Sequence, residues 1–169
     1  NINKTASPNY INQDLSQIAG YFAGDAHIST ENSIRATDSS INCLEEYKNI
    51  MKNTFSYEPK IKHHSDKTKN AFVLEINNAG ILRFLKTNLN EIFNPSNKKV
   101  IPEKIILSSN DNIKAFIRGF ADAEGSVSDK EIVISSTSHK ILEQLQFLLS
   151  SLSIPASLNH KRNTINISS

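Results

Sequence analysis

One pattern occurs twice in this sequence, first as Ile18-Ala19-Gly20-Tyr21-Phe22-Ala23-Gly24-Asp25-Ala26 and again as Ile117-Arg118-Gly119-Phe120-Ala121-Asp122-Ala123-Glu124-Gly125. Both copies read apolar, any residue, Gly, aromatic, apolar or small, any residue, small, carboxylate, small. A carboxylate therefore recurs at Asp25 and Glu124, 99 positions apart in a chain of 169 residues. A repeat of this kind predicts an internal duplication.

Each copy lies at the end of a predicted helix. The first helix begins with Asn12 or Asp14 as its cap and ends near Asp25, and the second is capped by Asp111 and ends at Glu124. Apolar residues recur at helical spacing in both helices: Leu15, Ile18, Ala19 and Phe22, then Ile113, Phe116, Ile117 and Phe120. The two acids are therefore expected at the C-terminal ends of matching helices.

The segments after these helices also correspond. Alternating polar and apolar residues predict hairpins at 27–38 and 60–76 in the first half, and at 126–136 and 156–168 in the second. Between each pair of hairpins lies a helix, capped by Ser39 or Ser40 in one case and by Ser136 or Ser138 in the other. A third helix at 79–90, capped by Asn78, has no repeat, so we expect the second half to be shorter or truncated.

The sequence thus predicts an α/β fold of the α+β kind. Its duplicated αββαββ(α) halves should be related by a pseudo-twofold axis, with two antiparallel four-stranded sheets forming a saddle. The predicted division of the chain is an N-terminal tail at 1–11, a first half at 12–90, a linker at 91–110 and a second half at 111–169.

The composition is that of an ordinary globular protein, with 38% hydrophobic and 21% charged residues. The net charge of +2 permits a nucleic-acid partner, provided that basic residues gather on one face. The one cysteine, Cys43, rules out internal disulfides and cysteine metal clusters and is expected in the core. No apolar run approaches about 20 residues and no signal peptide is evident, so we predict an intracellular protein without membrane contact.

Small residues recur within the repeated pattern, at Gly20 and Gly24 in one helix and at Gly119 and Ala123 in the other. At four-residue spacing they allow two helices to pack closely. Close packing would bring the carboxylates of Asp25 and Glu124 together, which is unfavourable unless a cation lies between them. Oxygen ligands of this type suit Mg²⁺, which also binds phosphate oxygens and water. Acids at helix C-termini oppose the helix dipole, so a purely structural role is disfavoured.

Both copies resemble the motifs of the LAGLIDADG homing endonucleases in their single-chain form. The stretch from Ile101-Pro102-Glu103 to Leu107-Ser108-Ser109 also resembles the lead-in to the second motif in intron- and intein-encoded members. The resemblance implies a mobile-element protein, monomeric, that cuts both strands of a long, pseudo-palindromic DNA target. It implies Mg²⁺ as cofactor, with Mn²⁺ or Ca²⁺ as substitutes. The first copy of the pattern in this chain ends in Ala26, where the family motif ends in glycine.

The resemblance also assigns roles to residues of this chain. The catalytic and metal-binding acids would be Asp25 and Glu124, joined at the metal site by the backbone carbonyls of Gly24 and Ala123. Polar residues near the ends of the first hairpins, which help to place water in the family, fall near Asp38 and Ser136. A basic residue completes the site in the family, and Lys62 is our candidate for it.

The predicted DNA-binding face follows from strand alternation, since side chains two positions apart lie on one face of a sheet. In the first half this face would carry His27, Ser29, Glu31, Ser33, Arg35, Thr37, Lys60, Lys62, His64 and Glu75. In the second it would carry Ser126, Ser128, Lys130, Val133, Ser135, Asn159 and Asn166. Phosphate contacts are expected from Lys67, Lys69, Lys161 and Arg162 at the turns.

Alternative functions remain open from the sequence. One is an RNA maturase, a splicing cofactor on the same fold, although the presence of both acids argues against loss of cleavage. Another is a DNA-binding regulator without catalysis. No splicing nucleophile begins the chain and no His-Asn pair ends it, so the sequence does not support an intein with its own splicing domain. An endonuclease domain excised from an intein stays open. The adjacent His63 and His64 would point to opposite faces of a strand, which disfavours a shared metal.

Overall fold

The computed structural model describes residues 10–66, 68–128 and 131–168. Its first half contains α1 (Gln13–Asp25), β1 (Ala26–Thr30), β2 (Ser33–Asp38), α2 (Ile41–Phe55), β3 (Lys60–His63), β4 (Phe72–Asn77) and α3 (Ala79–Leu89). Its second half contains α5 (Asn110–Glu124), β5 (Gly125–Val127), β6 (Glu131–Ser135), α6 (His139–Ser151), β7 (Ala156–Asn159) and β8 (Thr164–Ser168). The predicted duplication of helix, hairpin, helix and hairpin is confirmed.

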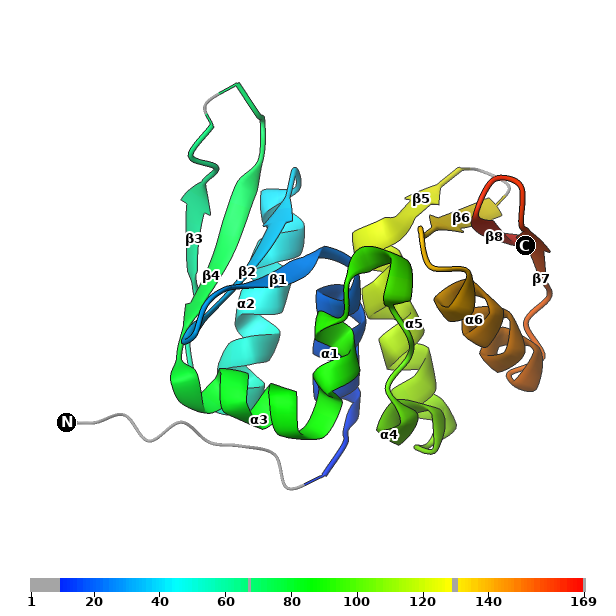
Figure 1. Ribbon diagram of the computed structural model, residues 1–169, viewed down its shortest axis with the longest axis horizontal. Coiled ribbons are helices and arrows are strands. Elements are labelled where there is room, and N and C mark those ends of the chain that lie inside the picture. Colours follow the sequence, from blue (N-terminus) through cyan, green and yellow to red (C-terminus); the bar gives the residue numbers. More distant parts are fainter. Residues whose placement is uncertain (1–9, 67, 129–130, 169) are drawn as a thin grey trace.

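Helices α1 and α5 lie side by side in the middle of the molecule, with one sheet on either side of them (Figure 1). A methyl group added at Gly20 would lie 2.1 Å from the carbonyl oxygen of Phe116. One added at Gly119 would lie 2.1 Å from that of Gln17. These two glycines therefore allow the helix backbones to touch, as the four-residue spacing of small residues within each helix predicts.

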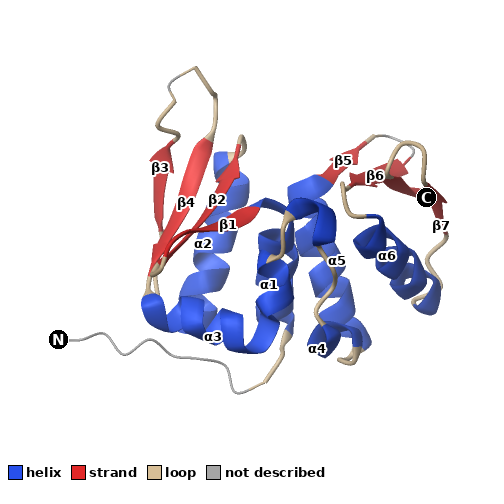
Figure 2. Cartoon of the chain, viewed as in Figure 1, coloured by secondary structure: helices blue, strands red, loops and turns tan. Residues whose placement is uncertain are grey.

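Each half contributes one four-stranded antiparallel sheet, in the order β1-β2-β4-β3 and β5-β6-β8-β7. The strands of the two sheets, red in Figure 2, lie on either side of the central helices. The second strand of each first hairpin pairs with the second strand of the later hairpin, so both sheets share one topology. The strands β1 and β5, which follow directly from α1 and α5, form the sheet edges nearest the central helix pair (Figure 1).

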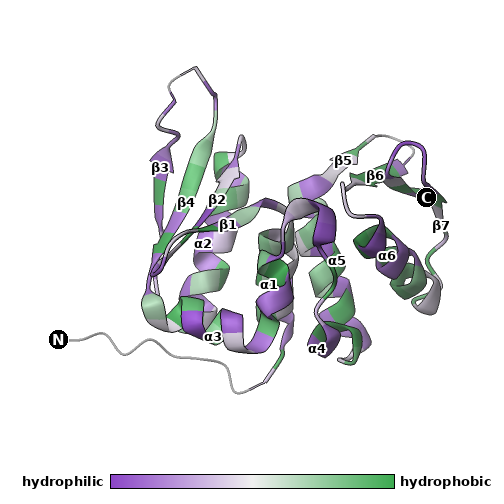
Figure 3. Cartoon of the chain, in the orientation of Figure 1, coloured by the Kyte–Doolittle hydropathy of each residue, from purple (hydrophilic) through white to green (hydrophobic). Residues whose placement is uncertain are grey.

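The core lies between the helices and one face of each sheet. Polar and apolar residues alternate along β2, along most of β3 and in the second part of β4 (Figure 3). On the buried face lie Ile34, Leu74 and Ile76 of the first sheet and Ile134 and Ile165 of the second, all fully buried. This alternation leaves the opposite face of each sheet polar.

Side-chain caps set the beginnings of the helices. Asn12, Ser40, Asn78 and Ser138 accept a hydrogen bond from a first-turn backbone N–H, in agreement with the sequence. The predicted cap of α5 is wrong, because Ser109 accepts the bond from the Asn112 N–H while Asp111 lies inside the first turn. The acid there still interacts favourably with the helix dipole.

The linker between the halves is ordered. It contains two 3-10 turns, η1 (Asn90–Phe93) and η2 (Ser96–Lys98), and the single helical turn α4 (Glu103–Ile106). The backbone N–H of Ile101 donates to the side-chain carbonyl of Gln144 at 2.9 Å, which ties the linker to α6. In the described part of the chain, no helix is long and apolar enough to cross a membrane.

Candidate active site and nucleic-acid interface

Asp25 and Glu124 are the last residues of α1 and α5. The two helix ends touch, because a methyl group at Gly24 would lie 2.3 Å from the Cβ of Ala123 and 3.1 Å from the Cγ of Glu124. The small residues of the repeated pattern thus bring both carboxylates to one place. Both helices continue directly into the edge strands of their sheets.

Burial of the two carboxyls raises their pKa values. That of Asp25 reaches about 7, chiefly through loss of hydration and then through the negative charges of Glu124 and Asp38. The pKa of Glu124 is raised by burial as well, and the ammonium group of Lys99 opposes the rise in both acids. Such perturbed acids at one site are typical of functional centres.

Lys99 is the residue that sequence reasoning missed. It is 7% exposed, and its Nζ donates to the carbonyl oxygen of Gly24 at 2.5 Å and lies 3.8 Å from Glu124 Oε1. Its own carbonyl accepts a hydrogen bond from Ser138 Oγ at 2.7 Å. Burial lowers the pKa of Lys99, while the two carboxylates favour its charged form. No periodic pattern marks this position, because Lys99 lies in the linker just after η2.

Each acid opens onto its own cavity. The one beside Asp25, of about 470 Å³, is lined by the start of β1 and by the linker, including Phe93 and Lys99. The one beside Glu124, of about 280 Å³, is lined by Ser136, Arg162 and their neighbours. Basic groups therefore differ between the two sides: a buried lysine on the first and an exposed arginine on the second.

Three residues predicted to support the acids have other contacts. Asp38 accepts hydrogen bonds from the Tyr21 hydroxyl at 3.1 Å and from the Ser40 N–H at 2.7 Å. Ser136 Oγ accepts from the Ser138 N–H at 3.2 Å, beside the Glu124 cavity. Lys62 forms an ion pair with Glu75 on the first sheet, whereas Lys99 is the lysine in contact with the two helix ends.

The donor set at the helix ends fits a divalent cation. Two carboxylates and the carbonyls of Gly24 and Ala123 offer hard oxygen ligands, although the Gly24 carbonyl already accepts a hydrogen bond from Lys99. Across residues 10–66, 68–128 and 131–168, no group of three or more His, Cys, Asp or Glu side chains is arranged to hold a metal ion. The remaining ligands would then be water and phosphate oxygens, as is usual for Mg²⁺.

The polar faces of the sheets carry most of the residues predicted for DNA contact. Exposed among them are His27, Glu31, Arg35, Lys60, Lys62, Lys69, Ser126, Ser128, Ser135, Asn159, Lys161 and Arg162. Ser29, Thr37, His64, Val133 and Asn166 are half-buried, and Ser33 is only 5% exposed. Glu31 lies in the turn after β1, not on a strand. Lys67 and Lys130 lie outside the described residues.

The model of the LAGLIDADG-like domain matches residues 12–88 and 111–168, which include both helix-end acids. The chain belongs to this family. Among curated relatives, glutamine–fructose-6-phosphate aminotransferase of Methanocaldococcus jannaschii is 34% identical over 156 residues, which are 91% of this chain and 14% of that protein. The replication factor C small subunit of the same organism is 30% identical over 173 residues, 96% of this chain and 9% of that protein. The chain thus spans a small part of each relative.

Solved structures share the LAGLIDADG fold of this chain. The homing endonuclease I-DmoI in complex with DNA and Ca has a TM-score of 0.68 at 17% identity, covering 95% of this chain and 85% of that one. Full-length WhiA from Thermotoga maritima has a TM-score of 0.65 at 14% identity, covering 97% and 53%. Other I-DmoI structures contain DNA with Mn or Mg. Identities this low establish the fold, which by itself does not decide an activity.

Proposed function

We propose that this LAGLIDADG chain is a site-specific, metal-dependent DNA endonuclease that hydrolyses phosphodiesters on both strands of a long, pseudo-palindromic duplex. Asp25 and Glu124 would be its catalytic acids, one for each strand. The chain would act as a monomer, since its two halves supply the symmetry that a two-stranded cut requires. The likeness to I-DmoI, whose structures contain DNA and divalent metals, supports this proposal.

One observation carries the proposal: two like-charged acids are partly buried together at helix C-termini. Burial and mutual repulsion raise the pKa of Asp25 to about 7, and the helix dipoles add to the cost. A protein that only binds DNA gains nothing from such a pair. In an enzyme that must hold a cation beside a phosphate, the same pair of carboxylates would bind that cation.

The metal-binding residues would be Asp25, Glu124 and the carbonyls of Ala123 and Gly24. A bound Mg²⁺, or Mn²⁺ in its place, supplies an activated water and charge stabilisation at the leaving oxygen. Lys99 offsets part of the negative charge of the two acids in the free protein and donates a hydrogen bond to the Gly24 carbonyl. We assign to it the role of the basic residue at the scissile phosphate, in place of Lys62.

The polar sheet faces would lie in the major groove on either side of the helix pair. Two-stranded ribbons fit that groove, where side chains reach the base edges. The exposed lysines and arginines on these faces and at the turns would contact phosphates. Basic residues gathered on this side would give a chain of net charge +2 a cationic face for DNA.

We also propose that this segment is carried inside host genes. It matches 14% of an aminotransferase and 9% of a replication factor subunit, two proteins whose names describe unrelated tasks. A segment shared by such different proteins is typical of an inserted element. The uninterrupted form of its host gene would then contain the target.

The test is cleavage of a plasmid library that carries long randomised duplex segments, incubated with Mg²⁺ or Mn²⁺. The parent protein is expected to linearise plasmids that share one sequence. Asp25→Asn and Glu124→Gln should each slow this reaction by about a thousandfold or more, by analogy with loss of a central catalytic group. Asp14→Asn, at the exposed opposite end of α1, should leave it intact.

Two results would contradict the endonuclease. Tight, selective binding of a duplex with no cutting in either metal would identify a DNA-binding regulator. Selective binding of structured RNA together with assisted splicing, and no cutting, would identify a maturase.

A further inference from the structure

Glu75 occupies an unusual place on the polar face of the first sheet. It lies on β4, directly opposite Arg35 of β2 and Lys60 of β3 in the strand register. Its neighbours in sequence, Leu74 and Ile76, face the core, so Glu75 faces the predicted DNA. It is nevertheless only 5% exposed, because other side chains cover it. A buried carboxylate at the middle of a binding face requires an explanation.

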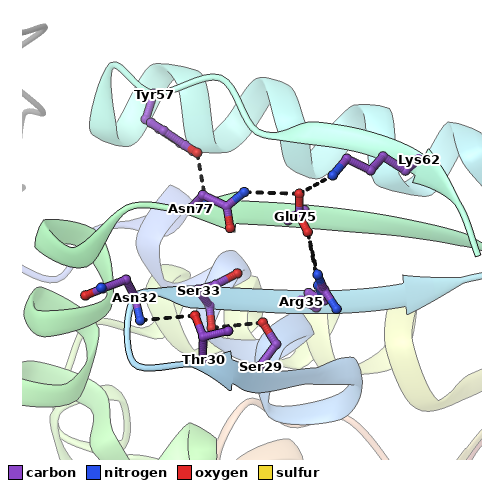
Figure 4. Close-up of polar contacts among 9 residues, drawn as sticks. All are labelled: Ser29, Thr30, Asn32, Ser33, Arg35, Tyr57, Lys62, Glu75 and Asn77. Atoms are coloured by element: carbon purple, nitrogen blue, oxygen red, sulfur yellow. Dashed lines mark hydrogen bonds and ion pairs between the residues drawn. The ribbon is translucent and has the colours of Figure 1, made fainter. Parts of the chain in front are cut away.

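The side chains around Glu75 hold it from both sides (Figure 4). Arg35 donates from Nε at 3.1 Å and from Nη2 at 2.8 Å, both to Oε1. Lys62 Nζ at 2.5 Å and Asn77 Nδ2 at 3.1 Å donate to Oε2. These donors, first Lys62 and then Arg35, lower the pKa of Glu75 to about 2, so the carboxylate is charged at neutral pH. Glu75 thus binds two cationic side chains from two different strands.

The geometry of the Arg35 contact leaves one edge of the guanidinium available. A guanidinium has two forked edges, one made by Nε and Nη2 and the other by Nη1 and Nη2. Glu75 occupies the first of these. The second lies at the tip of a side chain that is 47% exposed. Two parallel N–H groups at that tip match the O6 and N7 acceptors that guanine presents in the major groove.

We infer that Glu75 is a positioning residue that holds Arg35 end-on toward the major groove, so that the target contains a guanine opposite Arg35. The inference rests on the proposed DNA-binding function. In the free protein the carboxylate already fixes the arginine rotamer, which removes an entropic cost from binding. It also keeps Lys62 in place beside the same base pair, within a cavity of about 230 Å³ that His27 and Thr37 line as well.

The second half supplies an internal comparison. Val133 and Asn166 are paired there in the register that Arg35 and Glu75 occupy in the first half. Asn166 Nδ2 donates to Glu131 at 2.9 Å, and Val133 contributes no cation. The two sheets therefore share their strand arrangement, but the arginine–carboxylate–lysine cluster of Arg35, Glu75 and Lys62 lies on the first sheet. We expect the guanine preference in one half-site only.

The experiment selects duplexes from a library of randomised DNA and sequences those bound by the parent and by variants. The parent is expected to select one guanine in one half-site. Glu75→Gln keeps the size of the side chain but removes the charge, and should reduce that preference at least fivefold, in line with loss of an aligned bidentate contact. It should also make the slope of log binding constant against log salt concentration steeper by about one, because a cationic side chain released from Glu75 then contacts a phosphate.

Glu58→Gln is the matched control. Glu58 forms ion pairs with Lys48 and Lys52 beside α2, and its replacement removes the same charge away from the sheet face. It should leave base preference unchanged. In an Arg35→Met background, Glu75→Gln should have no further effect on the preference. Should Glu75→Gln fail to fold, Arg35→Lys replaces the fork by a point charge and should lose the same preference.

The outcomes separate the two proposals. If the parent selects a site and Glu75→Gln retains its guanine preference while only thermal stability falls, Glu75 is structural and the inference is overturned. The same holds if Glu58→Gln relaxes the preference equally. If the parent selects no duplex at all, the DNA-binding function and the inference fall together.

Discussion

At the scale of single residues, the candidate site depends on how charge is balanced at two helix ends. Asp25 and Glu124 repel each other and lose hydration, and Lys99 offsets part of that cost from within the linker. Ala26, where the family motif has glycine, costs nothing in backbone strain, because its φ is −92°. Gly125 of the second copy has a φ of −94°, so neither copy needs glycine here for a left-handed backbone, although a methyl group at Gly125 would lie 2.3 Å from the carbonyl oxygen of Ala121.

Replacing Asp25 by Asn should stabilise the metal-free protein at high pH. The folded-state pKa of about 7 exceeds the usual aspartate pKa of 3.8, so the folded state binds more protons than the unfolded state between these values. Stability contributed by this group therefore falls as pH rises from about 4 to about 7. At pH 8 the variant should exceed the parent by about 1–2 kcal/mol, and near pH 4 the two should agree. Urea unfolding across this range measures it, and a difference independent of pH would contradict it.

Replacing Lys99 by Met should lower both stability and cleavage. The change leaves the Gly24 carbonyl without its donor and the two carboxylates without their cation. We expect a loss of about 1–3 kcal/mol at pH 8, as for a buried charged group that loses its partner. Lys98→Met, at an exposed neighbouring position, is the control. Equal stability and cleavage rates in the two variants would show that Lys99 has no special role.

At the scale of elements, the contact between α1 and α5 positions both acids. Gly20 and Gly119 each face a carbonyl oxygen of the other helix, with no room for a methyl group. Two packed backbones are stiff, so the helix ends cannot separate to relieve the repulsion between their carboxylates. The edge strands β1 and β5 begin at these helix ends, so the contact between the helices also positions these strands.

Gly20→Ala and Gly119→Ala should each destabilise the protein by about 1–3 kcal/mol, as overpacking does in a close-packed core. They should reduce cleavage as well, because the acids would shift. Gly80→Ala is the control, since a methyl group there lies 3.2 Å from the Asn78 side chain and meets no other close neighbour. It should be neutral within about 1 kcal/mol. Thermal unfolding of the three variants checks this, and similar melting temperatures for all would contradict it.

At the scale of the whole molecule, the two halves share a topology but differ in chemistry. The first sheet carries the Glu75 cluster, and the cavity beside Asp25 contains Lys99. The cavity beside Glu124 contains Arg162. The halves are also joined by side chains, since the Tyr47 hydroxyl of α2 donates to Asp122 of α5 at 2.7 Å. A pseudo-twofold scaffold with unequal sites predicts unequal cutting of the two strands.

Replacing Arg162 by Gln should slow one strand cut more than the other. Arg162 is a basic residue beside Glu124 and does not line the Asp25 cavity. Loss of one charge-stabilising donor costs about tenfold or more in rate, so nicked plasmid should accumulate before linear product. Lys140→Gln removes the same charge from an exposed position on α6, outside the predicted DNA contacts, and should leave both cuts unchanged. A variant that slows both strands equally would contradict the assignment.

Local patterns of the sequence determined the elements of this protein. Caps such as Asn12 and Ser40, helical spacing and strand alternation act over a few residues, so the order of helices and strands could be predicted. The four-residue spacing of Gly20 and Gly24, repeated at Gly119 and Ala123, likewise predicted the helix contact that brings the acids together. The cap of α5 was wrong because Ser109 and Asp111 both suit a cap, and backbone geometry selects between them.

Only the tertiary structure decided which side chains surround those acids and which cover Glu75 on the polar face of the first sheet. Lys99 reaches the helix ends because the linker is tied to α6, a contact between segments with no shared local pattern. Glu75 is buried on a polar face because strand register places Arg35 opposite it and brings Lys62 within reach. Periodicity predicts which face a residue occupies, whereas its partners on that face depend on pairing between distant strands.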